Sequence, residues 1–244
     1  IVPRREAISA WWCWMAEEIS ALTPGRHCGL TRLLTFHNAY ARLCASFSVL
    51  CLAAREAGEL RFTTHNLRAE ARFSSFVDKH VGIFPGEVRV PINELLRRQL
   101  KFWMAHCQAL QRRLKRMSDS PAKDLMRMLD GYLSGVSRAL YFEIDVIRCR
   151  PIPLGSATLV RWWPEALRFT SDFGRHFWEV ELRDAKVRSS RIDVLLRHIT
   201  LGVEAHCSTN ADRLKDIAAE ICSTQERLLE ALGVQPVPGL NSKI

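Results

Sequence analysis

The chain has 244 residues, of which 48% are hydrophobic and 25% are charged, as is typical of a folded domain with a substantial core. No signal peptide is recognisable and no apolar run is long enough to span a bilayer, so we expect no membrane partner. The formal charge of +9, supplied mostly by arginine, makes polyanions the first partners to consider.

The cysteines are scattered and include no C-x-x-C pair, which favours a reducing compartment and argues against a disulfide framework or a zinc site. Several of them lie in apolar helical patterns, where a cysteine behaves as a small hydrophobic residue. We therefore expect no metal and no cofactor. The eight are Cys13, Cys28, Cys44, Cys51, Cys107, Cys149, Cys207 and Cys222.

The first predicted element is an amphipathic helix over residues 5–22 that carries Trp11, Trp12 and Trp14. Tryptophans beside arginines can stack on bases, but at helical spacing they are more often core residues. Since the chain starts at isoleucine, we expect a processed chain or a fragment. Residues 1–30 then form an N-terminal helical arm or the remnant of an upstream domain.

The most apolar predicted helix covers residues 36–55, and its stripe contains Phe36, Tyr40, Leu43, Phe47 and Leu50. Between residues 70 and 90, alternating apolar residues around a glycine-containing turn predict an antiparallel hairpin. A long basic helix follows from Pro91 to residue 117. Its cations form either a solvated face or a track for phosphates.

The second half of the chain predicts shorter elements. We expect a short helix within 118–135, a proline-interrupted loop at 148–156, a last amphipathic helix at 212–232 and a tail at 236–244. The predicted fold class is therefore mostly α with a small antiparallel β-sheet near residues 70–91 (α+β).

One pattern in residues 172–209 stands out. Arg175 and His176 open one amphipathic segment, and a second segment ends in Leu195-Leu196-Arg197-His198. Two short helices around a turn would bury one apolar face and leave Arg175 and His198 free to point at a common site. Taken singly, each has a simpler interpretation, a surface cation and a solvated histidine.

This layout resembles the catalytic domain of the tyrosine recombinases, the phage integrase family. That family has an Arg-His pair opening one helix, and a leucine, a small residue and a histidine ending the next at this separation. Here Arg197 replaces the small residue. The resemblance covers about residues 36–232 and implies a recombinase-like catalytic domain over 31–235.

The resemblance also implies roles around a scissile phosphate, where cations neutralise oxygens and an acid protonates the leaving oxygen. Arg55 resembles the first arginine, at the end of the 36–55 helix, although a slip of one residue would place Glu56 there. Lys79 resembles the hairpin lysine that acts as general acid. Its simpler interpretation is an ordinary lysine near a hairpin tip.

Three further positions complete the comparison. Arg175 resembles the second arginine, a bidentate phosphate clamp, and His198 resembles the residue that hydrogen-bonds the phosphate. Asp172 stands where the family most often has histidine. Because an aspartate would repel phosphate, we expect it to orient Arg175 or to cap the helix.

The expected nucleophile is missing. The family's tyrosine would lie nine residues past His198, and that position is Cys207, between His206 and Ser208. A thiolate with a lowered pKa is a strong nucleophile, although a single cysteine among eight is more often inert. Cys207 is therefore the candidate nucleophile.

Three functional hypotheses follow. The first is a DNA-binding site-specific recombinase or integrase of a bacterial mobile element, located in the cytoplasm with the nucleoid. It would act on double-stranded DNA by phosphoryl transfer, as a homo-oligomer or with a partner recombinase. The second is a catalytically inactive DNA-binding accessory or regulatory protein with the same fold. The third is a helical protein without a role on nucleic acid.

Overall fold

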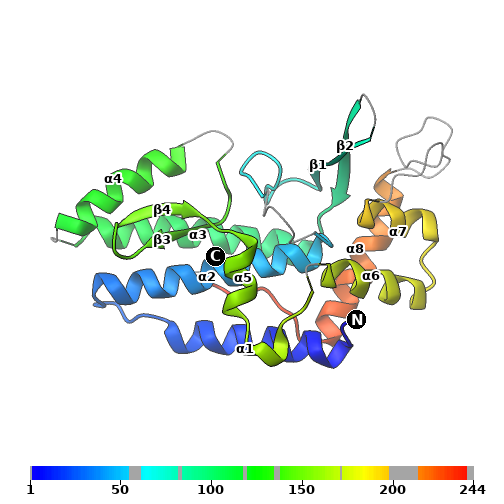
Figure 1. Cartoon of the computed structure of the whole chain (residues 1–244), viewed down its shortest axis with the longest axis horizontal. Coiled ribbons are helices and arrows are strands. Elements are labelled where there is room, and N and C mark those ends of the chain that lie inside the picture. The colour runs from blue at the N-terminus through cyan, green and yellow to red at the C-terminus, as the bar shows by residue number, and fades with distance from the viewer. Residues whose placement is uncertain are drawn as a thin grey trace.

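The structure is a computed structural model that describes residues 2–54, 62–81, 84–117, 120–134, 138–170, 172–197 and 214–240, with the backbone alone at 76–81 and 84–88. Helix dominates these residues, as the sequence predicts (Figure 1). The helices are α1 (Arg5–Leu22), α2 (Leu30–Cys51), α3 (Glu94–Lys115), α4 (Ser120–Ser134), α5 (Ser156–Trp162), α6 (Phe173–Asp184), α7 (Ser189–Leu196), α8 (Leu214–Ala231) and the short 3-10 helix η1 (Glu165–Leu167). The strands are β1 (Phe73–Val81), β2 (Phe84–Pro91), β3 (Phe142–Asp145) and β4 (Arg150–Pro153).

Helix α2 is the centre of the molecule. Its predicted apolar stripe is fully buried, and so is nearly every other residue from Leu33 to Cys51. Helices α1, α3, α5 and α6 and strand β3 all pack against it, so an element that is apolar on most sides finds a partner on each of them. In Figure 1, α2 lies between α1 and α3 through the middle of the view.

The two ends of α2 differ from the prediction. The helix begins at Leu30, and it ends at Cys51 rather than at residue 55. The helix stops because Ala53 adopts a left-handed backbone with φ of +48°, which cannot continue a right-handed helix. Arg55, predicted as the end of this helix, lies outside the described residues.

Helix α1 is built into the same core. Trp11 and Trp12 are buried, which confirms that these tryptophans belong to the core. At the start of the helix, Arg5 Nε lies 2.9 Å and Nη2 lies 2.6 Å from the carboxylate oxygens of Glu181 on α6. A boundary at residue 30 stays a prediction, but α1 shares its packing with the rest of the chain.

The hairpin predicted between residues 70 and 90 is confirmed as the β1–β2 pair. Val77 pairs with Glu87 and His80 with Pro85, so β1 carries one more residue than β2 in between. This bulge contains Asp78 and Lys79. Strand β2 also packs against α7 and α8, which attaches the base of the hairpin to the C-terminal helices.

A second antiparallel sheet was not predicted. The segment expected to be a proline-interrupted loop contains β4, which pairs with β3 so that Ile144 faces Pro151. Proline cannot donate to a ladder, but β4 is an edge strand in a two-stranded sheet, and there the missing amide is tolerated. The prediction of one sheet is therefore wrong, although the α+β class holds.

The last described segment folds back onto α2 and α3 rather than extending away. The Tyr40 hydroxyl donates to the carbonyl of Val237 at 2.9 Å, and the Val237 amide donates to Gln99 Oε1 at 2.8 Å. Gly239 lies so close that an added Cβ would be 2.6 Å from the Tyr40 ring. The predicted tail is thus packed in the described residues up to 240.

Helices α1, α2 and α3 are long, yet each carries polar or charged residues at a density that a bilayer core would not accept. Within the described ranges, none of the helices has the length and apolar character needed to cross a membrane.

Candidate functional site

The C-terminal end of α2 is the place where the C-terminal helices converge. The final carbonyls of any helix lack partners within the helix. Here four consecutive carbonyls, from Leu50 in the last turn to Ala53 just beyond the helix, each accept a hydrogen bond from a distant side chain. We call this arrangement the α2 end. Its hydrogen bonds are Trp178 Nε1 to Leu50 O (2.7 Å), Gln225 Nε2 to Cys51 O (2.9 Å), Arg197 Nη1 to Leu52 O (3.2 Å) and Arg197 Nη2 to Ala53 O (2.7 Å).

Helix α8 links the α2 end to the start of α3. Gln225 accepts from Asn93 Nδ2 at 3.0 Å, and Asn93 caps α3 by accepting the Leu96 amide at 2.8 Å. The neighbouring Glu226 carboxylate accepts the Glu94 amide at 2.6 Å, which places an anion at the positive end of α3. Two consecutive residues of α8 thus serve a helix C-terminus and a helix N-terminus.

Helix α6 begins directly against the α2 end. A Cβ added to Gly174 would lie 3.2 Å from the Val49 carbonyl oxygen and 3.7 Å from the Ala53 Cα, so a side chain here would make a tight contact with the end of α2. Arg175 follows at once and is only 6% exposed. The interpretation of Arg175 as a surface cation is therefore wrong.

Asp172 is the residue that precedes α6, as the capping alternative requires. Its carbonyl accepts the amides of Arg175 and His176 at 3.0 and 3.1 Å, while its side chain makes no capping hydrogen bond. The predicted cap by the Asp172 side chain is therefore not formed, and the two hydrogen bonds to its carbonyl are those with which the helix begins.

The structure describes only some of the predicted catalytic residues. Arg55, His198 and Cys207 lie outside the described residues, and Lys79 is described by its backbone alone, in the bulge of β1. The residues that precede Arg55 and His198 in the sequence, Ala54 and Arg197, are nevertheless described. Because Arg197 binds the Ala53 carbonyl and Gly174 touches the same residue, the described residues nearest to Arg55 and His198 in sequence lie together, beside Arg175.

The three tyrosines of the chain are all described, and none is suited to nucleophilic attack. Tyr40 donates to Val237, Tyr132 donates to the Ala139 carbonyl at 3.1 Å, and the Tyr141 hydroxyl lies 2.6 Å from Ser48 Oγ. Burial raises the pKa of all three phenols, most strongly for Tyr40 and Tyr141. Any covalent chemistry must therefore use another group.

Several described cysteines act as small hydrophobic residues, as the sequence predicts. Cys44, Cys51 and Cys107 are buried, and burial raises the pKa of each thiol, to about 12 for Cys107. Burial likewise raises the pKa of Cys222 to about 12. These thiols are protonated at neutral pH and are poor nucleophiles.

A buried histidine pair lies between α2 and α3. His37 Nδ1 is 3.0 Å from His106 Nε2, while Leu240 N–H donates to His106 Nδ1 at 3.1 Å. In a neutral imidazole one nitrogen donates and the other accepts, so His106 donates to His37, and His37 donates in turn to the Phe142 carbonyl at 3.2 Å. Since each of the four ring nitrogens has a partner, the pair is structural.

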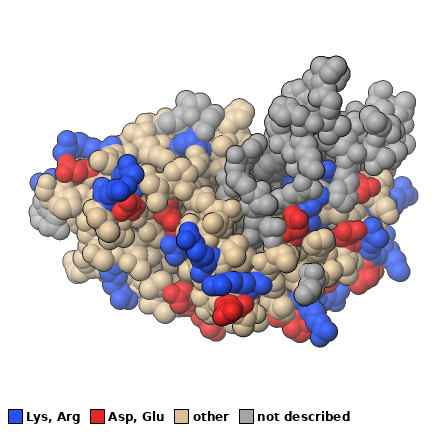
Figure 2. All heavy atoms as spheres, in the orientation of Figure 1, with Lys and Arg blue, Asp and Glu red and all other residues tan. Residues whose placement is uncertain are grey.

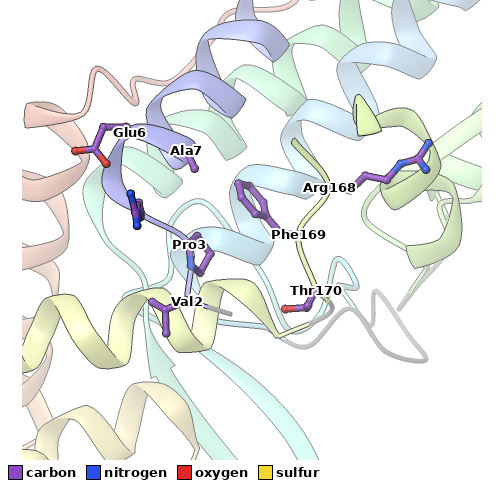
Figure 3. A pocket seen from close by; sticks show the side chains of 8 residues that line it. Val2, Pro3, Glu6, Ala7, Arg168, Phe169 and Thr170 are labelled. Carbon is purple, nitrogen blue, oxygen red and sulfur yellow. The ribbon is translucent and has the colours of Figure 1, made fainter. Parts of the chain in front are cut away.

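Elsewhere the described residues form surface hollows, among them one that Cys13 lines and one that Arg148 and Cys149 line. On the face shown in Figure 2, basic side chains are scattered and interspersed with acidic ones over the described residues, rather than gathered in one patch. A hollow of about 600 Å³ lies between the start of α1 and residues 168–170, with Phe169 facing Ala7 and Arg168 pointing away (Figure 3). Its lining contains no histidine or cysteine.

The sequence analysis missed the residues that build the α2 end. Gln225 lies one helical turn from both Ile221 and Leu229, so it is a polar residue inside an apolar stripe. Asn93 stands before the first turn of α3, where an amide side chain signals a cap. These two signals are readable in the sequence, but the shared target of the side chains is not.

Comparison with known proteins gives no match: no family model, no curated protein and no solved structure is similar to this chain.

Proposed function

We propose that this chain is a DNA-binding protein with a recombinase-like active-site region, acting on DNA in integration or recombination by phosphoryl transfer. The observation that carries the proposal is the α2 end. There the start of α6, with Arg175, and the end of α7, with Arg197, meet the segment that leads to Arg55. The recombinase resemblance assigns Arg175 to the phosphate site, and it also assigns Arg55 and His198, which follow Ala54 and Arg197 directly in the sequence.

The chemistry suits those positions. A phosphodiester in transfer carries charge on its non-bridging oxygens, and arginine neutralises it with two parallel donors from a planar group. Arg175 lies in the first turn of α6, where the backbone amides add a positive potential. Lys79, in a β-bulge, is at a type of position that often redirects a side chain next to an active site.

The nucleophile separates two forms of the proposal. In the first form Cys207 replaces the family's tyrosine, and the chain acts as a homo-oligomer or with a partner recombinase in the bacterial cytoplasm. In the second form the chain binds DNA as an accessory subunit and cuts nothing. The hydrogen-bonded, raised-pKa state of Tyr40, Tyr132 and Tyr141 favours the second form for the isolated chain.

Binding is tested with a mixed-sequence DNA duplex titrated at several salt concentrations. Each neutralised phosphate releases counterions, so the logarithm of the affinity should fall with the logarithm of salt by about 0.9 per phosphate contacted. An affinity that does not depend on salt, or no binding at low salt, would contradict the proposal and favour a helical protein without a nucleic-acid role.

Strand transfer is tested with a nicked suicide substrate that traps covalent intermediates. We expect no stable covalent adduct from this chain alone. A phosphorothioate ester between Cys207 and DNA is less durable than the phosphotyrosine ester that the resembled family forms. A trapped adduct that is lost in Cys207→Ser would contradict this expectation and establish a cysteine nucleophile. Cys222→Ser, a substitution of a thiol with a raised pKa, is the matched control.

A further inference from the structure

Arg197 ends α7 in an unusual backbone conformation. Its φ of +56° and ψ of 38° lie in the left-handed region, which residues with a side chain seldom adopt. A small residue such as glycine enters this region without strain, whereas arginine does not. Something must therefore hold Arg197 in place, and its own side chain provides the contacts.

The guanidinium of Arg197 is bound where α2 stops. Only 8% of the residue is exposed, and its two terminal nitrogens donate to two consecutive carbonyls, Leu52 O at 3.2 Å and Ala53 O at 2.7 Å. A cation at a helix C-terminus is stabilised by the negative end of the helix dipole. The planar fork of arginine spans both carbonyls, which a lysine ammonium cannot do with the same geometry.

This contact differs from the other two at the α2 end. Trp178 and Gln225 bind carbonyls of the last helical residues, Leu50 and Cys51, as side chains that cap a helix C-terminus do. Arg197 instead binds residues beyond the helix, including Ala53, whose own φ is +48°. It therefore connects two left-handed residues from distant parts of the chain and fixes the direction in which each segment leaves the core.

We propose that Arg197 is a positioning residue that sets the approach of residues 52–54 to residues 195–197, beside the start of α6. The inference rests on the proposed function, because Arg175, at the start of α6, is a residue that the resemblance assigns to the phosphate site. In this role Arg197 touches no DNA and acts through the backbone carbonyls that it binds. Arg197 stands where the resembled family carries a small residue, and it supplies two donors that a small residue lacks.

The test compares three purified variants of the whole chain. Arg197→Gly keeps the left-handed backbone accessible and removes both donors, while Arg197→Lys keeps the charge and at least one donor. Leu129→Ala is the destabilised control, since Leu129 is buried in α4, which packs against α3 and β4 and not against α2's C-terminal end. All measurements are made at a temperature where circular dichroism shows each variant folded.

The first measurement is amide hydrogen exchange, which needs no DNA. The amides of Leu52, Ala53 and Ala54 are hydrogen-bonded to Ser48, Leu50 and Val49, so their exchange reports on the α2 end. In Arg197→Gly we expect exchange at 52–54 and at 195–197 to rise together by about tenfold, because local opening becomes easier. Leu129→Ala should leave both segments as in the wild type. Unchanged exchange in Arg197→Gly would overturn the proposal.

The second measurement is duplex affinity for the same variants. Misplacement of binding groups by about 1 Å can lower function by about a hundredfold, so we expect Arg197→Gly to lose at least tenfold in affinity. Arg197→Lys should recover part of that loss, and Leu129→Ala should bind as the wild type does. If the wild type binds the duplex and Arg197→Gly binds it with the same affinity, the positioning role alone is overturned. A wild type that binds no duplex would remove the proposed function and the positioning role with it.

Discussion

At the scale of single residues, the buried histidine pair is held in one protonation state, because each of its ring nitrogens has a hydrogen-bond partner. Desolvation lowers the pKa of His37 to about 3 and lowers that of His106 well below its ordinary value. Both are therefore neutral in the folded chain at neutral pH. The pair joins α2, α3, β3 and the segment that ends at Leu240 through one chain of hydrogen bonds.

The pair makes stability dependent on pH. In the unfolded chain both histidines take up protons below the ordinary pKa of 6.5, whereas in the folded chain they stay neutral until much lower pH. The free energy of unfolding should therefore not depend on this pair above pH 6.5, and it should decrease as the pH falls below that value. The slope approaches about 1.4 kcal/mol per pH unit for each histidine.

Urea unfolding at a series of pH values between neutral and mildly acidic measures this slope. His106→Gln should reduce the slope, because one of the two buried histidines is gone. His176→Gln, at an exposed position on α6, is the matched control and should keep the wild-type slope. Equal slopes in the wild type and in His106→Gln would contradict the assignment of the pH dependence to this pair.

At the scale of elements, α2 is both the core of the fold and the scaffold of the candidate site. Its apolar stripe could be predicted because the spacing is regular, and so could the hairpin and the helix pair at 172–197. Its end could not be predicted, because Ala53 is left-handed and its carbonyl accepts from Arg197, a contact between residues far apart in sequence. Strand β4 was missed for the opposite reason, since its prolines locally indicate a loop.

The cap on α2 can be tested by comparing two buried tryptophans. Trp178 donates to the buried Leu50 carbonyl, whereas Trp11 Nε1 has no hydrogen-bond partner in the described part of the chain. Replacing either ring by phenylalanine removes the same volume from a fully buried position. Trp178→Phe should be destabilised more than Trp11→Phe by about 0.5–1.5 kcal/mol, because it also removes one of the two hydrogen bonds to the Leu50 carbonyl and leaves that from the Ala53 amide.

The difference is measured as the free energy of unfolding in urea for both variants. Chemical unfolding of the two proteins under identical conditions cancels the packing loss that they share. A loss in Trp11→Phe that equals or exceeds the loss in Trp178→Phe would show that packing, and not the hydrogen bond to α2, decides stability here.

At the scale of the whole molecule, the sequence was informative about layout and less so about chemistry. The fold class and the order of helices followed from periodicity, and the interval between Arg175 and His198 identified the region where α6 and α7 meet α2. The chemistry is less predictable, because a nucleophile is defined by environment rather than by residue type. The three tyrosines show this, since the hydroxyl group of each is hydrogen-bonded within the protein.

The most direct test of the central claim, that the α2 end holds DNA phosphate, is the salt dependence of duplex binding in a matched pair of arginine variants. Arg175 lies at the α2 end, and Arg148 lies in the turn between β3 and β4. In Figure 1 strands β3 and β4 lie on the left, whereas α6 and α7 lie on the right. Arg175→Ala should reduce the magnitude of the slope of log affinity against log salt by about one. Arg175→Lys, which keeps the charge, should retain the slope.

The result predicted is therefore a reduced slope in folded Arg175→Ala beside wild-type slopes in Arg175→Lys and in Arg148→Ala. A wild-type slope in Arg175→Ala, or an equal reduction in Arg148→Ala, would contradict the claim that phosphate binds at the α2 end.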